Sequence, residues 1–263
     1  MTTSPPRSAT IAELEQLVET TEQIRGAMES VIEGKPEVVA TALTVLLAGG
    51  HLLLEDVPGV GKTMLAKAMA RAIDCSVNRI QFTSDMLPSD ITGVSVYNPD
   101  RRDFEFKPGP VFANIVLGDE INRAPAKTQA AMLECMAEQH VSVDGVTYHL
   151  ETPFIVIATQ NPIEMTGTHR LPEAQRDRFM AWLSMGYPST EAELAMLDHR
   201  TETDPLQALT PVTDAAAVRA LIATVTTVHA SPQLKRYLVD LVSATRRHPQ
   251  LRLGASPRAT LHL

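Results

Sequence analysis

A strand, a glycine-bearing loop and a helix follow one another at residues 52–70, and this order constrains the fold more than any other segment. Leu52–Leu54 is a short apolar run, the loop after it carries Gly59 and Gly61, and Lys62 opens a helical stretch. Glycines let backbone N–H groups approach bound oxygens, and the positive end of the helix dipole favours negative charge. The segment therefore predicts a phosphate-binding loop inside an α/β fold.

Two side chains directly after this loop suit a nucleotide. Lys62 would place its charge on the β- and γ-phosphates, and the Thr63 hydroxyl would be a ligand of Mg²⁺. The general pattern, G-x-x-x-x-G-K-[ST], has glycine at the position that Asp56 occupies here, and a glycine-rich turn with a solvated lysine is the alternative. The predicted nucleotide contacts of the loop are Pro58, Gly59, Val60, Gly61, Lys62, Thr63 and Met64.

A second signal for nucleotide binding lies at residues 114–120, where an apolar run ends in the two acidic residues Asp119 and Glu120. At the carboxyl end of a parallel strand, Asp119 can bind Mg²⁺ through a water molecule beside the phosphate loop. Glu120 can orient and polarise a water molecule for attack on the γ-phosphate. An acidic pair that caps the next helix is the alternative. Together with the phosphate loop, the pair predicts an ATPase or GTPase of the phosphate-loop class.

Apolar runs that suit buried parallel strands recur along the chain. They are Leu52–Leu54, Val77–Phe82, Ile115–Leu117, Phe154–Ala158 and Ala181–Met185. Helical patterns precede or separate several of them, at residues 10–30, Val38–Ala48, Lys62–Ile73 and Lys127–Gln139. Strands that alternate with helices predict a three-layer α/β domain with a parallel sheet.

Two segments predict β-hairpins. Val141–Tyr148 has an Asp144-Gly145 turn between alternating flanks, which is a strong hairpin signal. The strands Val94–Tyr97 and Phe104–Lys107 form a weaker one.

The composition changes after Pro188, where we expect a small helical domain to begin. Its predicted parts are a helix at Thr190–His199, a connection at Thr201–Pro211, and helices at Asp214–Val228 and Pro232–Arg247. The predicted division of the chain is an N-terminal tail and helix at 1–30, a nucleotide-binding core at 31–188, and the start of a helical domain at 189–263.

Composition narrows the class of function. The 23 Lys and Arg against 31 Asp and Glu give a net charge of −8, which argues against a protein whose main function is to bind the phosphate backbone of a nucleic acid. The two cysteines, Cys75 and Cys135, form no CxxC pair, which fits a reducing compartment. No secretory signal is visible, and the longest apolar stretch, Ala42–Leu54, is too short to span a bilayer. We therefore expect a cytoplasmic protein without a membrane span and without a nucleic-acid partner.

Three further motifs resemble the MoxR family of AAA+ ATPases. They are Gly118–Gln129, the run Ile157–Glu164 continued by Leu171–Phe179, and Gly254–Ala259. The resemblance covers residues 10–263. It implies a five-stranded AAA+ core, a helical lid, a β-hairpin at Glu138–Pro153, and ATP with Mg²⁺ as the cofactors. It also implies assembly into a ring, usually a hexamer, and chaperone-like action on a client protein with a separate von Willebrand factor A domain partner.

The resemblance assigns roles to three polar residues outside the phosphate loop. Asn161 would read the γ-phosphate and help place the attacking water, although Asn161-Pro162 also suits a simple turn. Arg178 would be the arginine finger that reaches the nucleotide of a neighbouring subunit, and a surface ion pair is the alternative. Arg258, after a predicted helix start at Ser256-Pro257, would be the second sensor, and a solvated helix arginine is the alternative.

Two aspects of this assignment leave alternatives open. Arg176 stands where the family has an apolar residue, so Arg176 or Arg123 could act in trans instead of Arg178. The stretch Val31, Ile32 and Gly34 would contact adenine, or it would be an ordinary loop between helices.

The segment Gln81–Asp90 also resembles the family. Gln81, at a strand end, could hold Glu120 inactive until a partner binds. Asp85 and Asp90 are more simply interpreted as turn and cap residues.

Three functions are compatible with these residues. The first is an ATP-hydrolysing remodelling or activation factor for other proteins, and the second is a nucleotide-dependent binding switch or scaffold. A DNA or RNA motor is disfavoured by the acidic charge and the 4 % aromatic content. The resemblance also implies a lid that runs well past Ser256, so we expect the lid to be truncated here.

Overall fold

The computed structural model describes residues 8–57, 59–161, 171–191, 193–194 and 204–263. Residues 1–7 of the predicted tail, Pro58, and most of the helix predicted at Thr190–His199 lie outside these residues.

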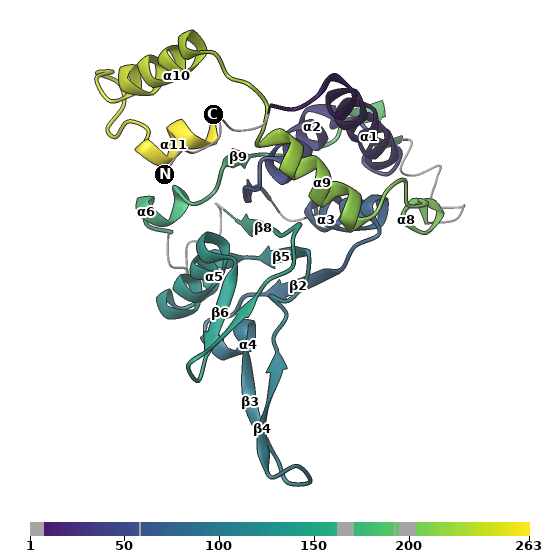
Figure 1. Cartoon of the computed structure of the whole chain (residues 1–263), viewed down its shortest axis with the longest axis vertical. Helices are drawn as coiled ribbons and strands as arrows, with labels where there is room; N and C mark the ends of the chain where they lie inside the picture. The colour runs from purple at the N-terminus through teal and green to yellow at the C-terminus, as the bar shows by residue number, and fades with distance from the viewer. Residues whose placement is uncertain (1–7, 58, 162–170, 192, 195–203) are drawn as a thin grey trace.

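A five-stranded sheet with parallel pairing forms the centre of the protein (Figure 1), in the order β2-β5-β8-β1-β9. Its strands are β1 (Leu52–Glu55), β2 (Val77–Gln81), β5 (Ile115–Asp119), β8 (Ile155–Gln160) and β9 (Ala181–Leu183). All five predicted strands are confirmed, with ends that differ by one to two residues.

Side chains that alternate along each strand separate the core into two layers. Leu52 and Leu54 of β1 pack in one buried cluster, and Leu53 packs in the other. Because successive strand side chains point to opposite faces, each apolar strand serves both layers at once. The three central strands, β5, β8 and β1, are buried on both faces, which explains their continuous apolar runs, whereas the edge strands β2 and β9 are partly exposed. The two layers of core on either side of the sheet confirm the three-layer α/β prediction.

Helices cover both faces of the sheet. The first cluster contains residues of α1 (Ile11–Glu29), α2 (Pro36–Leu47), α3 (Lys62–Ile73) and α9 (Ala215–Val225). The second contains residues of α4 (Pro88–Thr92) and α5 (Ala126–Glu138). A short 3₁₀ helix, η1 (Ile121–Arg123), joins β5 to α5. The predicted helices at 10–30, Val38–Ala48, Lys62–Ile73 and Lys127–Gln139 are confirmed, and that at Lys62–Ile73 has the predicted bounds.

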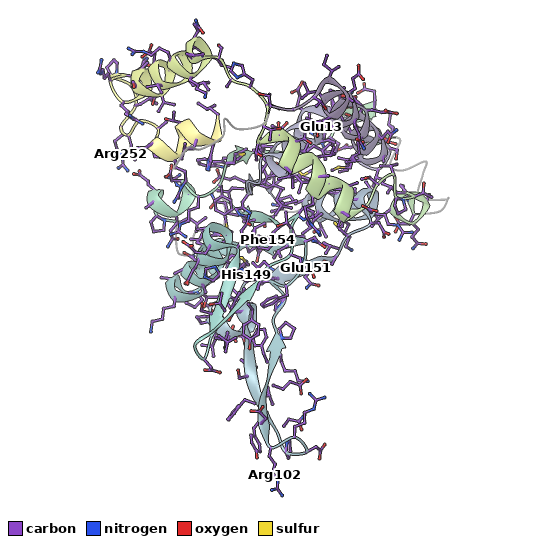
Figure 2. The ribbon with its side chains drawn as sticks, in the orientation of Figure 1. Glu13, Arg102, His149, Glu151, Phe154 and Arg252 are labelled. Atoms are coloured by element: carbon purple, nitrogen blue, oxygen red, sulfur yellow. The ribbon has the colours of Figure 1, made fainter. Side chains whose placement is uncertain are left out.

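Both hairpins are present outside the central sheet. β3 (Gly93–Asn98) pairs with β4 (Asp103–Pro108), and β6 (His140–Val143) pairs with β7 (Val146–His149). The β3–β4 hairpin projects from the body and carries Arg102 near its end (Figures 1 and 2). At the turn of β6–β7, Asp144 and Gly145 both have positive φ, as the Asp-Gly turn predicts.

The chain after residue 203 is helical. α9 contacts α1 and α2, whereas α10 (Pro232–Thr245) contacts α11 (Pro257–His262), and this second pair lies apart from the sheet (Figure 1). Ser256 caps α11 by accepting a hydrogen bond from the Ala259 N–H, and Pro257 is its first residue, as predicted. The interpretation of 201–211 as a connection was wrong in part, because Asp204 caps a short helix, α8 (Pro205–Ala208).

None of the helices in the described part of the chain is long and apolar enough to span a membrane.

Candidate nucleotide-binding site

The polar residues of the site lie where neighbouring parallel strands end. Glu55 is in register with Gln160, and Gln81 is in register with Asp119. The carboxyl ends of β1, β2, β5 and β8 therefore meet at one edge of the sheet, beside the N-terminus of α3. A cavity of about 230 Å³ opens at this edge. It is lined by Gly59, Gly61, Lys62, Thr63, Arg79, Gln81, Asp119, Glu120, Thr159 and Asn161.

The phosphate loop has the backbone that its glycines require. Gly59 has φ +87° and Gly61 has φ +93°, a region that residues with a Cβ rarely adopt. The space beside Gly59 is open to 4 Å, so a ligand can approach the backbone closely there. The N-terminus of α3 follows at Lys62, which places the N–H groups of a helix end at the loop.

Lys62 is half-buried at the mouth of the loop. Its Nζ donates hydrogen bonds to the carbonyl oxygens of Asp56 at 2.7 Å and Val57 at 3.2 Å. Burial lowers the pKa of Lys62, and the charges of Asp56, Asp119 and Glu120 oppose that shift. An ammonium that lines the cavity at the N-terminus of a helix is suited to bind a phosphate chain.

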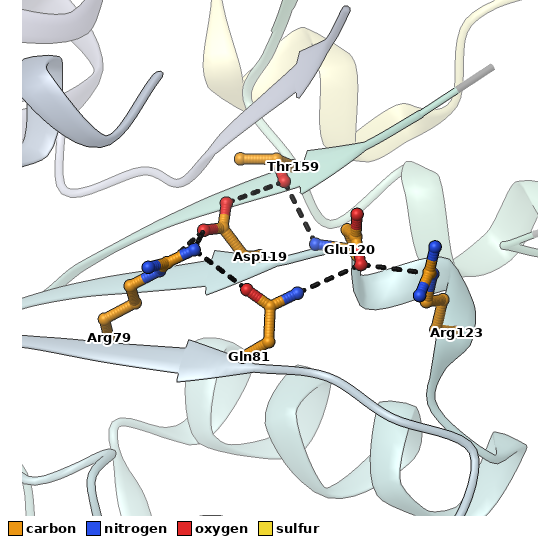
Figure 3. Close-up of polar contacts among 6 residues, drawn as sticks. All are labelled: Arg79, Gln81, Asp119, Glu120, Arg123 and Thr159. Carbon is orange, nitrogen blue, oxygen red and sulfur yellow. Dashed lines mark hydrogen bonds and ion pairs between the residues drawn. The ribbon is translucent and has the colours of Figure 1, made fainter. Parts of the chain in front are cut away.

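Asp119 is buried and held by two neighbouring strands (Figure 3). Its Oδ2 accepts from the Nε and Nη2 atoms of Arg79 at 2.7 Å each, and its Oδ1 accepts from the Thr159 hydroxyl at 3.0 Å. The two carboxylate oxygens are thereby fixed in direction beside Lys62. A single aspartate that is already paired is a modest cation site, so a metal ion would need further oxygen ligands.

Glu120 follows Asp119 in an unusual backbone conformation. Its φ is +58°, which is uncommon for a residue with a side chain, and its N–H donates to the Thr159 hydroxyl at 3.0 Å. The same hydroxyl thus accepts from Glu120 and donates to Asp119 (Figure 3). Thr159 consequently sets the relative position of the two acidic residues.

The carboxylate of Glu120 contacts two further side chains. The Gln81 amide donates to Oε2 at 3.0 Å, and the Arg123 Nε lies 3.1 Å from the same oxygen (Figure 3). The Gln81 side-chain oxygen in turn accepts from Arg79 at 2.9 Å. A continuous polar chain therefore links Asp119, Arg79, Gln81, Glu120 and Arg123. The predicted proximity of Gln81 and Glu120 is observed, whereas Asp90 accepts from the Leu87 N–H as a cap residue.

The residues present fit Mg²⁺ with a nucleotide. Thr63 supplies a hydroxyl and Asp119 a carboxylate, which are the hard oxygen donors that Mg²⁺ prefers, and phosphate oxygens usually complete its shell. The described residues contain no cluster of three or more His, Cys, Asp or Glu that would bind a metal without such phosphates. The donor set therefore suits Mg²⁺ carried by a phosphate ligand.

The structure brings most of the predicted catalytic set together, but not all of it. Asn161 is buried and lines the cavity with Lys62, Thr63, Asp119 and Glu120. Pro58 lies outside the described residues. Val60 and Met64 pack, partly buried, against the core cluster. Of the predicted adenine contacts, Ile32 is buried in that cluster, Val31 packs against it, and Gly34 is exposed with φ +72°.

The predicted arginines lie elsewhere within this single chain. Arg178 lines a second cavity, of about 540 Å³, and donates to the Leu133 carbonyl. Arg258 forms an ion pair with Asp177, and Arg176 lies over the Trp182 ring at 5.3 Å. Arg176 also lies 3.9 Å from the Glu173 carboxylate, so its charge has both a cation–π and an ionic contact in this chain. Arg123, the other candidate for action in trans, contacts Glu120 of its own chain.

Sequence reasoning missed two residues of the site. Thr159 lies in the motif Ile157–Glu164, two positions before Asn161, and its motif was the available signal. Arg79 is a charged residue in the middle of a predicted strand, which was the available signal. Both take their function from side chains on other strands.

Comparison with known proteins agrees with this geometry. The family profile described as "ATPase family associated with various cellular activities (AAA)" matches residues 51–181. The solved structure of a candidate ATPase from Cytophaga hutchinsonii superposes with a TM-score of 0.86 at 36 % identity, covering 95 % of this chain and 80 % of that one.

Curated relatives extend over most of the chain. An uncharacterised protein, YeaC of Bacillus subtilis, is 51 % identical over 89 % of this chain and 73 % of its own length. Chaperone MoxR1 of Mycobacterium tuberculosis is 44 % identical over 93 % of this chain and 67 % of its own length. Protein MoxR of Paracoccus denitrificans is 32 % identical over 90 % of this chain and 76 % of its own length. With the phosphate loop, the acidic strand end and the sheet order in place, the chain belongs to the MoxR family of AAA+ ATPases.

Proposed function

We propose that this protein hydrolyses ATP in a Mg²⁺-dependent reaction and uses the cycle to remodel or activate other proteins. The observation that carries the proposal is that Glu120 lies in one cavity with Lys62, Thr63 and Asp119. A carboxylate at that position can orient and polarise a water molecule, while the lysine and the helix N-terminus bind phosphate oxygens.

Each residue of the cavity then has one task. Lys62 binds the β- and γ-phosphates, and Thr63 and Asp119 hold Mg²⁺, Asp119 through a water molecule. Mg²⁺, when bound with the nucleotide, neutralises charge on the phosphate oxygens. Asn161 helps place the attacking water, and its amide offers both a donor and an acceptor for that purpose.

We also propose roles in hydrolysis for two arginines that lie outside the cavity, Arg178 and Arg258. In a ring of subunits, which we expect to be a hexamer, Arg178 would reach the nucleotide of the neighbouring protomer and stabilise transition-state charge. Arg176 and Arg123 are the alternatives for this role. Arg258 would contact the γ-phosphate from a helical lid that begins after residue 188.

The relatives support chaperone-like action on proteins, but they do not identify the client protein. Similarity to a protein named chaperone MoxR1 favours work on protein clients. We propose a separate partner with a von Willebrand factor A domain and a cytoplasmic location, which suits the free thiols of Cys75 and Cys135.

A nucleotide-dependent binding switch is the second candidate, and a specific contact favours it. The Glu120 carboxylate is tied to both Gln81 and Arg123. A glutamate held in this way would polarise water poorly and ATP would be hydrolysed slowly, so the ATP-bound form would persist long enough to recruit a partner.

Phosphate release from ATP with Mg²⁺ tests the proposed activity. We expect turnover by the parent and its loss in Lys62→Ala, together with weak nucleotide binding. Glu55→Gln is the matched control, because Glu55 is a neighbouring carboxylate that contacts the Gln160 side chain and does not line the cavity. Equal turnover by Lys62→Ala and the parent contradicts the assignment. A variant blocked in hydrolysis that still activates its client supports the switch over the remodelling factor.

A further inference from the structure

The residue that departs from the general phosphate-loop pattern is a buried acid. Asp56 stands where that pattern has glycine, directly after β1, and its relative exposure is 8 %. A buried carboxylate is unfavourable unless hydrogen bonds or charges compensate it. The contacts of Asp56 therefore indicate what the acid does.

The Asp56 side chain is fully engaged by three donors. Its Oδ2 accepts from the Gly186 N–H at 2.6 Å and from the Ser184 hydroxyl at 2.9 Å, and its Oδ1 accepts from the Val57 N–H at 2.8 Å. Burial alone would raise the pKa of Asp56, but these hydrogen bonds and the Lys62 charge hold it below its usual value. The carboxylate is thus ionised at neutral pH, and its hydrogen bonds are of the strong, charge-assisted kind.

The main chain of the same residue faces the phosphate site. The Asp56 carbonyl accepts from Lys62 Nζ at 2.7 Å. Asp56 therefore connects the lysine of the phosphate loop, through its backbone, to Ser184 and Gly186, through its side chain.

The segment that Asp56 holds, residues 184–187, makes two other contacts, one with the phosphate loop and one with the loop before α2. Met185 is buried, and its Cε lies 3.7 Å from the position that a Cβ on Gly61 would take. The Tyr187 carbonyl accepts from Lys35 Nζ at 2.8 Å. Residues 184–187 thus touch the beginning and the end of the phosphate loop and the loop before α2. They follow β9 and lead into the C-terminal helical part of the chain.

We propose that Asp56 is a positioning residue that couples the phosphate loop to segment 184–187. Phosphate binding at Lys62 then alters the hydrogen bonds by which Asp56 fixes this segment, which leads out of the core. The coupling rests on the proposed function only in that the phosphate ligand is a nucleotide. A glycine at this position allows phosphate binding but has no side chain to accept hydrogen bonds from residues 184 and 186.

Hydrogen–deuterium exchange on the full chain, with and without ADP and Mg²⁺, tests the coupling in the parent and in Asp56→Gly and Asp56→Asn. In the parent, nucleotide slows exchange both in the phosphate loop and in 184–187. In both variants nucleotide still slows exchange in the phosphate loop, but 184–187 no longer responds. Without nucleotide, the Gly186 N–H exchanges about tenfold faster in Asp56→Asn, because the amide offers a poorer acceptor than the carboxylate.

Two further variants test whether the effect is specific to the Asp56 contact. Glu55→Gln, at the preceding residue, should behave as the parent. Ser184→Ala removes one donor from the other side of the contact and should show a partial loss of coupling, which replaces the Asp56 variants if they fold poorly. A nucleotide response of 184–187 that is equal in the parent, Asp56→Gly and Ser184→Ala overturns the inference, as does a parent segment that never responds while nucleotide binds. Binding of a fluorescent ADP analogue, measured separately, distinguishes this result from failure of the proposed function, in which the parent binds no nucleotide.

Discussion

The side-chain amide of Gln81 donates a 3.0 Å hydrogen bond to the carboxylate of Glu120, from the end of the neighbouring strand β2. Arg123 approaches the same carboxylate oxygen from the 3₁₀ helix that follows. The residue proposed to polarise water is therefore positioned by two partners with different chemistry, one neutral and one charged.

Removal of the neutral partner should release Glu120 in part. We expect Gln81→Ala to raise the basal rate of ATP hydrolysis about threefold, since one hydrogen bond to a charged group is lost while Arg123 remains. Steady-state phosphate release measures the effect, with Gln207→Ala as the control for loss of an exposed amide. A rate that falls instead would mean that Gln81 aligns Glu120 for catalysis and does not restrain it.

Arg79 should influence the metal requirement. Its guanidinium contacts Asp119 Oδ2 through two nitrogen atoms. Because the Arg79 side chain is largely exposed, this ion pair is of moderate strength, and Arg79→Met should lower the Mg²⁺ concentration for half-maximal nucleotide binding about two- to fivefold. A titration of Mg²⁺ against a bound fluorescent nucleotide checks this. An unchanged or higher requirement would show that Arg79 does not compete for the carboxylate.

His51 should make the fold sensitive to acid. Burial lowers the pKa of His51 to about 4, although the hydrogen bond that its Nε2 donates to the Met136 carbonyl opposes this shift. Its Nδ1 accepts from the Val156 N–H, as only a neutral ring can. The folded state disfavours the charged ring, so the unfolded chain binds more protons between pH 6.5 and 4. Stability from this residue is complete above pH 6.5 and is lost as the pH falls, by about 2 kcal/mol near pH 4.5.

Urea unfolding at pH 7.5 and 4.5 measures that slope. His51→Gln should lose about 2 kcal/mol less than the parent over this interval, whereas His149→Gln, at an exposed histidine on β7, should follow the parent. Equal pH slopes for His51→Gln and the parent would contradict a neutral, buried ring.

Both thiols should be unreactive in the folded protein. Burial raises the pKa of Cys75 to about 12 and that of Cys135 to about 12. Because the thiolate is the nucleophile, labelling by a disulfide reagent at pH 8 should be slow until urea unfolds the chain. Rapid reaction of either cysteine in native buffer would show that its region opens locally.

Local patterns were sufficient to predict the strands of the sheet, the two hairpins and the longer helices, but not the short helices α4, η1 and α8. The apolar runs predicted the three central strands because these are buried on both faces, and the edge strands β2 and β9 because enough of their side chains pack on the core. The Asp144-Gly145 turn predicted its hairpin because both residues adopt positive φ. Gly59, Gly61, Lys62 and Thr63 could be assigned to a phosphate site because they lie in one short segment whose chemistry is local.

Contacts between distant segments could not be predicted in the same way. Thr159 bridges Asp119 and Glu120 only because β8 lies beside β5, and Arg79 reaches Asp119 only because β2 does so on the other side. The contacts of the Asp56 carboxylate could not be predicted, since its partners Ser184 and Gly186 lie about 130 residues away along the chain. Likewise, nothing local in α9 indicated that it packs on α1 and α2.

The rate of ATP hydrolysis by Glu120→Gln, compared with the parent at saturating ATP and Mg²⁺, tests the central claim most directly. The substitution keeps the size and shape of the side chain but removes the charge that polarises water and replaces one acceptor oxygen by an NH2 donor. Nucleotide binding should be retained, and the turnover rate should fall about 100-fold or more. Equal turnover by Glu120→Gln and the parent, with nucleotide bound in both, would contradict it.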